Sequence, residues 1–544
     1  MTRWGMIADL ERCVGCQTCT AACKHTNATS PAVQWRKVLD LEVGTYPSVK
    51  RVFVPVGCMH CEDPPCMHVC PSTATGQRAD GIVTIDYDIC IGCAYCAVAC
   101  PYQARFKVDG ASFAYGGDGQ MKNEAKREDP ARLGVAQKCT FCSDRIDYGL
   151  ENGLTPGIDP DATPACVNSC IASALHFGDL NDPASNVSKL LDTHQTFRMH
   201  EELGTAPGFH YIWKRKDSHD TNIEEDILSI SSSGTGDIGG AAPWLQQHWD
   251  WRAAGNFIGG GTGSGLMVAV AVLSTFTPVS FLLILLALGF VGAGLFLVWL
   301  ETGRPFRAPL NVFFNPQTSW MSRESMVGSA LFPIALIAAW LGAPPLLLAA
   351  AIVAFGFLYC QGRLLKACKG IPAWREPAIV KLIMTTGLSE GAGLLLAVSS
   401  LAVYVMPASF LAGIAMPPSI HVGLTSTLVV LLAFRMLSWR FYRNALKLEA
   451  PSETLRVVHS LNAAFVLLGH LLPMILIASG YLFIDASTLL NAGAGALALG
   501  AGWFIKYQLV TQASYNQGYA INHAPERGSG GGGPGGKPGW SRAA

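Results

Sequence analysis

The chain has 544 residues, which is long enough for three or four ordinary domains, so we expect more than one compact unit. Charged residues make up only 14% of the chain and hydrophobic residues 50%, and the mean hydropathy is +0.30. Because soluble domains carry about 25% charged residues, these values argue against a wholly soluble protein and indicate a membrane part. Lysine plus arginine and aspartate plus glutamate both number 39, and this balance excludes the strong basic excess of a nucleic-acid-binding protein.

The cysteines are concentrated in the first third of the chain. Sixteen of the 18 lie between Cys13 and Cys170. A disulfide scaffold is typical of short secreted chains, and the N-terminal residues hold neither an apolar stretch of signal-peptide length nor a twin-arginine pair. We therefore expect these thiols to be metal ligands in a reducing compartment.

Residues 1–228 have the composition of a soluble domain. Short strand-like runs at 52–56 and 82–85 each lead directly into a cysteine group. The Ser/Gly-rich stretch at 229–240 is typical of a flexible linker. Trp244, Trp249 and Trp251 follow it, so we expect the segment 229–255 to end in an aromatic belt at the membrane interface.

Residues 256–508 are expected to form an all-α membrane anchor. Eight apolar segments occur there, near 257–275, 279–300, 326–342, 345–360, 382–405, 411–434, 461–484 and 487–505. Most of these segments approach the length of roughly 20 residues that a helix needs to cross the hydrocarbon core of a membrane, although the third and fourth are short. A buried helical core of a soluble protein is the alternative, but so many long apolar runs with few charges favour membrane spans. We expect residues 509–544 to form a Gly/Pro-rich tail that is disordered, or wraps onto a partner, from Pro525 onward.

Basic residues are distributed unevenly over the loops between these segments. The loops between spans two and three, four and five, and six and seven hold 13 Lys and Arg residues, and the other four loops hold none. By the positive-inside rule the basic loops lie in the cytoplasm. With eight spans, both termini and the cysteine-rich half are then expected on the cytoplasmic side of a bacterial inner membrane.

The sixteen clustered cysteines form four groups of four. Two groups have the spacing C-x2-C-x2-C-x3-C and two are expanded versions of it. Three closely spaced thiolates can hold three corners of a 4Fe-4S cubane, while the fourth, displaced by three residues, faces a neighbouring cluster. Zinc also takes four thiolates and is the alternative, but the repeated spacing favours four 4Fe-4S clusters. The groups are Cys13, Cys16, Cys19 and Cys23; Cys58, Cys61, Cys66 and Cys70; Cys90, Cys93, Cys96 and Cys100; and Cys139, Cys142, Cys166 and Cys170.

The groups and their surroundings, GMIADLERCVGCQTCTAACK, CMHCEDPPCMHVCP, DICIGCAYCAVACPYQAR and KCTFCSDR, resemble the four-cluster electron-transfer subunit of the dimethyl sulfoxide reductase family of molybdenum enzymes. The resemblance implies an α+β bacterial-ferredoxin-like domain. In it the first and fourth groups exchange their last cysteines, and so do the second and third groups. One departure is Ile171, where Pro often follows the final cysteine. The implied ligand sets are Cys13, Cys16, Cys19 and Cys170; Cys23, Cys139, Cys142 and Cys166; Cys58, Cys61, Cys66 and Cys100; and Cys70, Cys90, Cys93 and Cys96.

The membrane half resembles the eight-span quinone-binding anchor of the same complexes, which is normally a separate polypeptide. The similarity rests on the helix number and on LETGRPFRAPLN, TSWMSRES and HSLNAAFVLLGH. It implies a quinone-site acid at Glu324, and this chain has Glu301 where relatives often carry His. The chain therefore resembles a fusion of the iron-sulfur subunit with its anchor.

Quinone chemistry moves protons as well as electrons, so ionisable residues in or near the spans are candidates for the quinone site. For Glu301, Arg304, Arg323 and Glu324, the alternative is a solvated loop with ordinary ion pairs. For His470 the alternative is a neutral imidazole bonded between helices, and a b-type haem held by His421, His459 or His470 is a further alternative. The candidates are Glu301, Arg304, Arg323, Glu324, Glu390 and His470.

The sequence thus predicts a redox subunit without a substrate-converting site of its own, because no molybdopterin-sized domain fits into the remaining residues. The resemblance implies a separate large subunit that carries molybdopterin, and electron exchange with a membrane quinone. A cytoplasmic orientation resembles the sulfite-oxidising branch of the family. The main alternative is a quinol-dependent reductase of dimethyl sulfoxide, polysulfide or tetrathionate. A minor alternative is an ion-translocating anchor.

Overall fold

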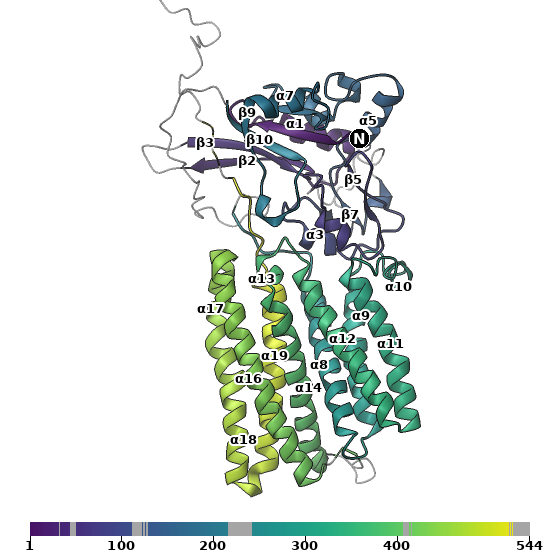
Figure 1. Ribbon diagram of the computed structural model, residues 1–544, viewed down its shortest axis with the longest axis vertical. Helices are drawn as coiled ribbons and strands as arrows, with labels where there is room; N and C mark the ends of the chain where they lie inside the picture. The colour runs from purple at the N-terminus through teal and green to yellow at the C-terminus, as the bar shows by residue number, and fades with distance from the viewer. Residues whose placement is uncertain are drawn as a thin grey trace, which may run out of the picture.

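The computed structural model describes residues 1–31, 33–43, 50–110, 129–215, 242–405, 413–414 and 416–521, together with positions 122, 126, 523 and 525. An α+β half is stacked on one end of a bundle of long helices (Figure 1). The fold class expected from the sequence, a ferredoxin-like half followed by eight apolar helices, is confirmed. The predicted linker at 229–240 and the tail beyond Pro525 lie outside the described residues.

The α+β half is built on a four-stranded sheet with the order β8-β1-β10-β9. The central strand β1 is buried at all six positions and pairs parallel to β10 and antiparallel to β8. Three two-stranded hairpins, β2–β3, β4–β5 and β6–β7, accompany it, and β3 and β5 are the strands predicted at 52–56 and 82–85. The strands are β1 Trp4–Asp9, β2 Arg36–Val43, β3 Lys50–Gly57, β4 Thr75–Gln77, β5 Val83–Ile85, β6 Phe106–Lys107, β7 Ala136–Gln137, β8 Leu175–Asp179, β9 His194–Phe197 and β10 Phe209–Arg215.

Short helices follow the cysteine loops of this half. Gly15 and Gly92 have φ values of 70° and 68°, a left-handed conformation that turns the chain between two cysteines of one group. Gln17 and Ala94, also left-handed, immediately precede the helices that carry the next cysteine. The helices are α1 Thr18–Asn27, α2 Pro65–His68, α3 Tyr95–Ala99, α5 Ser143–Glu151, α6 Ala165–Asn168 and α7 Asn186–Thr193.

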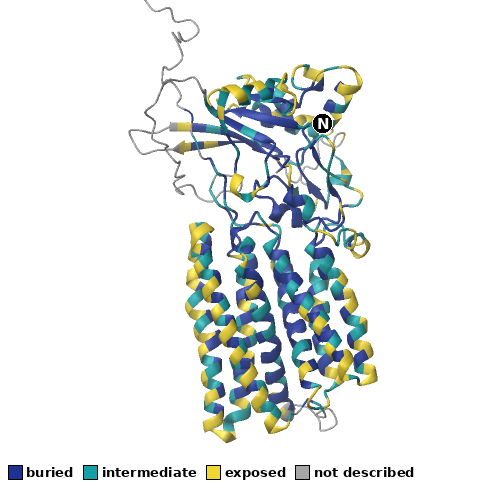
Figure 2. Ribbon diagram, in the orientation of Figure 1, coloured by how far each residue is buried: buried dark blue, intermediate teal, exposed yellow. Residues whose placement is uncertain are grey.

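The described residues contain eight helices that are long and apolar enough to cross a membrane, as the sequence predicts. The third and fourth, expected to be short, have 22 and 23 residues. Outward faces are largely exposed, whereas α8 lies inside the bundle (Figure 2). The helices are α8 Trp251–Leu273, α9 Phe281–Glu301, α11 Trp320–Leu341, α12 Pro344–Lys366, α14 Ala378–Val405, α16 Pro418–Glu449, α17 Ser452–Val466 continued through a π-helical segment Leu467–Leu471 into α18 Leu472–Leu482, and α19 Ser487–Thr511.

The two halves are joined by polar side chains of the bundle that donate to carbonyl oxygens of the cysteine loops. Asn315 Nδ2 donates to Cys70 O at 2.9 Å, and Ser319 Oγ donates to Val69 O at 2.8 Å. Gly303 lies so close that a Cβ atom would stand 2.1 Å from Gly134 O. These residues lie on the α9–α11 connection, which includes the short helix α10 Ala308–Asn311, so the motifs that resemble the anchor family also form the contact between the halves.

Segments before α8 and after α19 complete this contact. Residues 512–521 return to the α+β half, where Tyr519 is buried and its hydroxyl donates to Tyr102 O at 3.3 Å. The predicted aromatic belt is wrong for Trp244 and Trp249, because both are buried within the protein. Trp251 starts α8 and is 56% exposed, and its place at the membrane interface stays a prediction.

Candidate redox and quinone sites

The structure brings the members of each implied cysteine set together. Two sets each line a cavity of about 320 Å³. In the other two sets, Cys23 lies close to Cys139, Cys142 and Cys166, and Cys93 lies close to Cys70, Cys90 and Cys96. We call them the outer set (Cys13, Cys16, Cys19 and Cys170), the second set (Cys23, Cys139, Cys142 and Cys166), the third set (Cys58, Cys61, Cys66 and Cys100) and the membrane-side set (Cys70, Cys90, Cys93 and Cys96).

The cysteines of these sets surround open space rather than a single point. Within the parts of the chain that the structure describes, no three His, Cys, Asp or Glu side chains converge as a site for one metal ion. A 4Fe-4S cubane takes one thiolate at each of four iron corners, so its ligands stand around a group of several atoms. The donor chemistry and the lined cavities therefore fit the predicted clusters.

The four sets are arranged in a row between the far end of the α+β half and the membrane bundle. Cys19 of the outer set is a neighbour of Cys166 in the second set. Cys139 of the second set is a neighbour of Cys58 in the third, and the third and membrane-side sets meet through Cys66 and Cys96. Iron-sulfur clusters held by these sets would let electrons enter at one end of the row and leave at the other.

One buried cation stands at each junction of this row. Arg36, the first residue of β2, lies beside the outer and second sets. Lys138, which follows β7, lies beside the second and third sets. Arg105, which precedes β6, lies beside the third and membrane-side sets. Their side chains are buried, with exposed fractions of 1%, 1% and 3% for the three residues in this order.

The three cations donate to sulfur atoms and to a carbonyl oxygen. Arg105 Nη2 donates to Cys66 Sγ at 3.0 Å. Desolvation lowers the pKa of Arg105, but the surrounding thiolates raise it by more, so it lies above its ordinary value. Arg36 Nη2 donates to Met6 Sδ at 3.1 Å, and Lys138 Nζ donates to Cys139 O at 2.6 Å. A buried charge needs compensation, which thiolate-bound iron-sulfur clusters would supply.

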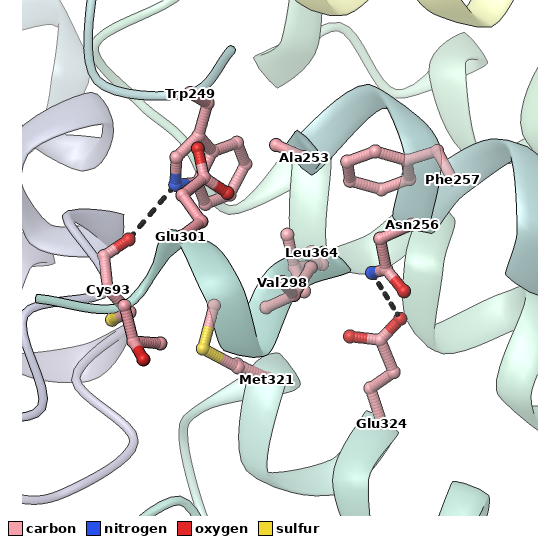
Figure 3. A pocket seen from close by; sticks show the side chains of 11 residues that line it. Cys93, Trp249, Ala253, Asn256, Phe257, Val298, Glu301, Met321, Glu324 and Leu364 are labelled. Atoms are coloured by element: carbon pink, nitrogen blue, oxygen red, sulfur yellow. Dashed lines mark hydrogen bonds between the residues drawn. The ribbon is translucent and has the colours of Figure 1, made fainter. Parts of the chain in front are cut away.

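A cavity of about 360 Å³ lies where the membrane-side set meets the bundle (Figure 3). Trp249 covers one side, and its Nε1 donates to Cys93 O at 3.1 Å. The wall is mainly apolar with a few polar groups, which is the lining typical of small-molecule sites. The lining residues are Cys93, Trp249, Ala253, Asn256, Phe257, Val298, Glu301, Thr302, Met321, Glu324 and Leu364.

Two predicted carboxylates lie in the wall of this cavity. Glu324, on the second turn of α11, is 3% exposed, and its Oε1 accepts from Asn256 Nδ2 at 3.2 Å. Glu301, the last residue of α9, is 5% exposed, and its Oε1 accepts from the backbone N–H of Asp250 at 3.2 Å. The alternative of solvated loop carboxylates is therefore wrong for both residues.

The two predicted arginines of this region serve other contacts. Arg304 Nε donates to Leu133 O at 3.1 Å and so ties the α9–α11 connection to the α+β half. Arg323 Nε donates to Pro316 O at 2.8 Å, and its guanidinium lies 4.2 Å from the centre of the Trp320 ring. Both side chains hold the loop that precedes α11 rather than the cavity wall.

Glu390 and His470 lie deeper in the bundle and are both fully buried. Glu390 on α14 pairs with Lys506 on α19, with 2.7 Å between Oε2 and Nζ. His470 lies in the π-helical segment, where its Nδ1 donates to Phe465 O at 2.8 Å and its Nε2 accepts from Arg435 Nε at 3.2 Å. Both ring nitrogens are engaged, so the geometry favours an imidazole bonded between helices over a haem ligand.

Sequence reasoning missed two buried cations of the bundle. The loop count includes Arg435 among the basic loop residues, but it lies within α16 and is fully buried. Lys506 stands at the end of the last apolar segment, where a lysine is expected to reach the interface. The signal that identifies it is Glu390, because a carboxylate inside a span requires a partner.

Comparison with known proteins identifies relatives of the α+β half. Residues 49–117 match the model of a 4Fe-4S dicluster domain. A selenate reductase subunit of Mesobacillus selenatarsenatis is 39% identical over 226 residues, which is 39% of this chain and 72% of that protein. A protein of Halobacterium salinarum described as a dimethyl sulfoxide reductase iron-sulfur subunit is 40% identical over 263 residues, covering 44% and 93%. A sulfite dehydrogenase subunit of Allochromatium vinosum is 36% identical over 242 residues, covering 41% and 89%.

These relatives are named as subunits of oxidoreductases, and the Halobacterium protein is named as an iron-sulfur subunit. The chain belongs to the iron-sulfur subunits of dimethyl sulfoxide reductase-family complexes. In this polypeptide that subunit is continuous with eight helices that are long and apolar enough to cross a membrane. The role of a redox subunit follows from the family, whereas the relatives' names cover several different substrates.

Proposed function

We propose that this chain relays electrons between a molybdopterin-containing catalytic subunit and a membrane quinone. The four cysteine sets hold 4Fe-4S clusters, and the quinone head group occupies the cavity beside Cys93. The observation that carries the proposal is this cavity, because it combines a cysteine of the membrane-side set with two buried carboxylates. A quinone needs an electron donor or acceptor and proton-exchanging groups at one place, and these residues supply both.

The outer set supports a docking site for the catalytic subunit at the opposite end of the row. Cys16 is exposed, unlike most of the clustered cysteines. Val14 and Ile171, both next to cysteines of this set, are 54% and 72% exposed. Apolar side chains at the edge of a redox group are suited to a protein partner, which would bring its own cofactor close to the outer cluster.

The favoured reaction of the whole complex is sulfite oxidation at the cytoplasmic face, with electrons passing to quinone. The basic loops of the bundle are on the same side as the α+β half, since Lys369 Nζ donates to Leu203 O at 3.0 Å and Arg307 Nη1 to Tyr87 O at 2.7 Å. The positive-inside rule then favours a cytoplasmic α+β half. One relative is a sulfite dehydrogenase subunit, which supports this direction.

The second candidate is a quinol-dependent reductase. Other relatives are subunits of tetrathionate reductase from Salmonella typhimurium and polysulfide reductase from Wolinella succinogenes. The same row of clusters and the same cavity would serve a reductase, with electrons moving from quinol to the catalytic subunit.

The experiment is sulfite-dependent quinone reduction by membranes that contain the complete complex. Glu324→Gln removes a proton-exchanging group from the cavity wall, so we expect the rate to fall by about 10²-fold. Glu449→Gln is the control, because this carboxylate is exposed and pairs with Arg375 at the end of α16. Tetrathionate or polysulfide reduction by quinol, with no sulfite oxidation, would establish the second candidate instead. Equal rates for Glu324→Gln and the wild type would contradict the quinone site.

A further inference from the structure

We propose that the Glu390–Lys506 pair is a proton-exchange site that serves the quinone cavity from inside the bundle. The inference rests on the proposed quinone function and adds a site that lies outside the cavity wall. Glu390 lies on α14 and Lys506 on α19, and both side chains are fully buried. Their charges balance, but one carboxylate oxygen, Oε1 of Glu390, is buried without a hydrogen-bond partner among the described residues.

The other carboxylate oxygen is the centre of a hydrogen-bond chain. Glu390 Oε2 accepts from Lys506 Nζ at 2.7 Å and from Thr262 Oγ1 at 3.0 Å. Thr262 in turn accepts from Trp503 Nε1 at 2.8 Å. One oxygen is thus saturated and holds the carboxylate in place, while the free oxygen remains the position at which a proton can bind.

The α8 helix provides the space for this pair through glycines. A Cβ atom on Gly261 would stand 2.0 Å from Lys506 Nζ, and one on Gly502 of α19 would stand 2.4 Å from Glu390 Oε1. A Cβ atom on Gly260 would stand 2.2 Å from Gln361 Nε2. Adjacent glycines of α8 therefore accommodate the ion pair on one side and the amide of Gln361 on the other.

Hydrogen bonds connect these groups to residues that line the quinone cavity. Lys506 Nζ donates to Phe257 O at 2.9 Å, and the side chain of Phe257 lines the cavity. Gln361 Nε2 donates to Asn256 O at 2.9 Å, and Asn256 Nδ2 donates to Glu324 (Figure 3). Asn256 Oδ1 and Gln361 Oε1 are also buried without hydrogen-bond partners among the described residues. Buried polar atoms of this kind are commonly bridged by water, so a hydrogen-bonded route can join Glu390 to the cavity.

Two buried cations and a hydroxyl group act on the Glu390 carboxylate. Lys506 on α19 and Arg435 on α16 are the cations that act on the carboxylate, while α8 contributes Thr262. Arg435 is itself held by Ala498 O at 2.8 Å and by His470. The carboxylate is therefore held beside two buried cations, and its Oε1 is the atom that remains without a partner among the described residues.

Oxidation of one quinol in the cavity releases two electrons and two protons. The electrons pass to the predicted clusters, one proton leaves by Glu324, and the other binds Glu390 to give a neutral carboxylic acid beside the Lys506 ammonium group. In the direction of quinone reduction, Glu390 returns this proton to the forming quinol.

The test is redox-induced infrared difference spectroscopy of the complete complex in lipid vesicles, with a water-soluble ubiquinone analogue as the probe. We expect a C=O stretching band of a protonated buried carboxyl group in the presence of quinol. Glu390→Gln should abolish the band and slow quinol oxidation by about 10²-fold, whereas Glu390→Asp should retain it at a shifted frequency. Glu449→Gln is the control and should leave the band unchanged.

The double variant Glu390→Gln/Lys506→Met covers the case in which the single change leaves Lys506 stranded and the protein does not fold. It removes both charges, and it should fold, bind the quinone analogue and lack the band. If the band whose frequency Glu390→Asp shifts persists in either folded variant, the proton site is overturned while the quinone function remains intact. If the wild-type complex gives no quinone-dependent signal at all, the proposed function fails and this inference fails with it.

Discussion

Both halves of the molecule bury charged side chains, but they compensate them in opposite ways. In the α+β half Arg36, Lys138 and Arg105 meet sulfur atoms, rings and carbonyl groups between the cysteine sets. In the bundle Lys506 meets a carboxylate, Glu390, at 2.7 Å. The first arrangement needs an anionic group from outside the chain, whereas the second is neutral by itself.

The difference indicates where each half obtains its stability. Iron-sulfur clusters with four thiolate ligands carry negative charge, so the α+β half is complete only with its clusters bound. The bundle depends on apolar packing and on a pair of opposite charges, which fold without any cofactor. Removal of iron should therefore destabilise the α+β half, and removal of either Glu390 or Lys506 should destabilise the bundle.

Iron removal should have the largest effect. Chelation under reducing conditions leaves three buried cations uncompensated, and each stranded charge costs about 3–5 kcal/mol. We expect residues 1–215 to lose protection against hydrogen exchange, while α14 and α19 retain theirs. Mass-spectrometric hydrogen exchange on the complete chain measures both halves at once, and equal protection before and after chelation would contradict the comparison.

Lys506→Met should destabilise the bundle but spare the α+β half. The change leaves Glu390 as an unpaired buried carboxylate, and we expect a loss of about 3–5 kcal/mol in the free energy of unfolding. Thermal unfolding in detergent, followed by circular dichroism, measures it. The double variant with Glu390→Gln should recover most of the stability, and a double variant as unstable as Lys506→Met would disprove the pairing.

Arg105→Met should shift a reduction potential with little effect on folding as long as the clusters are bound. The guanidinium donates to Cys66 at 3.0 Å, and the positive charge favours the reduced cluster of the third set. A charged hydrogen bond is worth about 1.5–3 kcal/mol, so the potential should fall by about 60–130 mV. Redox titration followed by electron paramagnetic resonance checks the value. Arg51→Gln, at an exposed pair with Asp40, should change no cluster potential.

The partly exposed pair Arg78–Asp147, whose arginine also pairs with Asp80, should give the smallest effect. The hydrogen bond from Arg78 holds the pKa of Asp147 below its ordinary value. A carboxylate with a lowered pKa in the folded protein contributes stability above its unfolded pKa and loses it as the pH falls through the folded pKa. Because Asp147 is 43% exposed, Arg78→Gln should cost less than about 1 kcal/mol at pH 7, and the difference should vanish in acid. Urea unfolding at both pH values measures it.

Much of this architecture can be predicted from the sequence. Repeated cysteine spacing predicts the clusters because ligand geometry is local, and long apolar runs predict the eight spans because the bilayer sets their length. Glu324 and Glu301 are identifiable as carboxylates close to the spans. Their burial is not, since it depends on how Trp249 and the α9–α11 connection cover them.

The residues that sequence reasoning missed are those whose role depends on a distant partner. The end of an apolar run places Arg435 in a loop, but α16 continues past it to Glu449. Asn256 and Gln361 have no distinctive local pattern, and only helix packing brings them to Glu324 and α8. The row of buried cations likewise appears only when the cysteine sets are placed in space.

The most direct test is quinol-driven reduction of the clusters in the purified, oxidised full chain, followed by electron paramagnetic resonance. The account predicts that the wild-type chain is reduced by quinol and that Cys93→Ser, which removes a predicted cluster ligand beside the cavity, is not. Cys368→Ser, which changes a buried cysteine outside the four sets, should behave like the wild type. Unimpaired reduction of the remaining clusters in Cys93→Ser would contradict electron transfer through the membrane-side set.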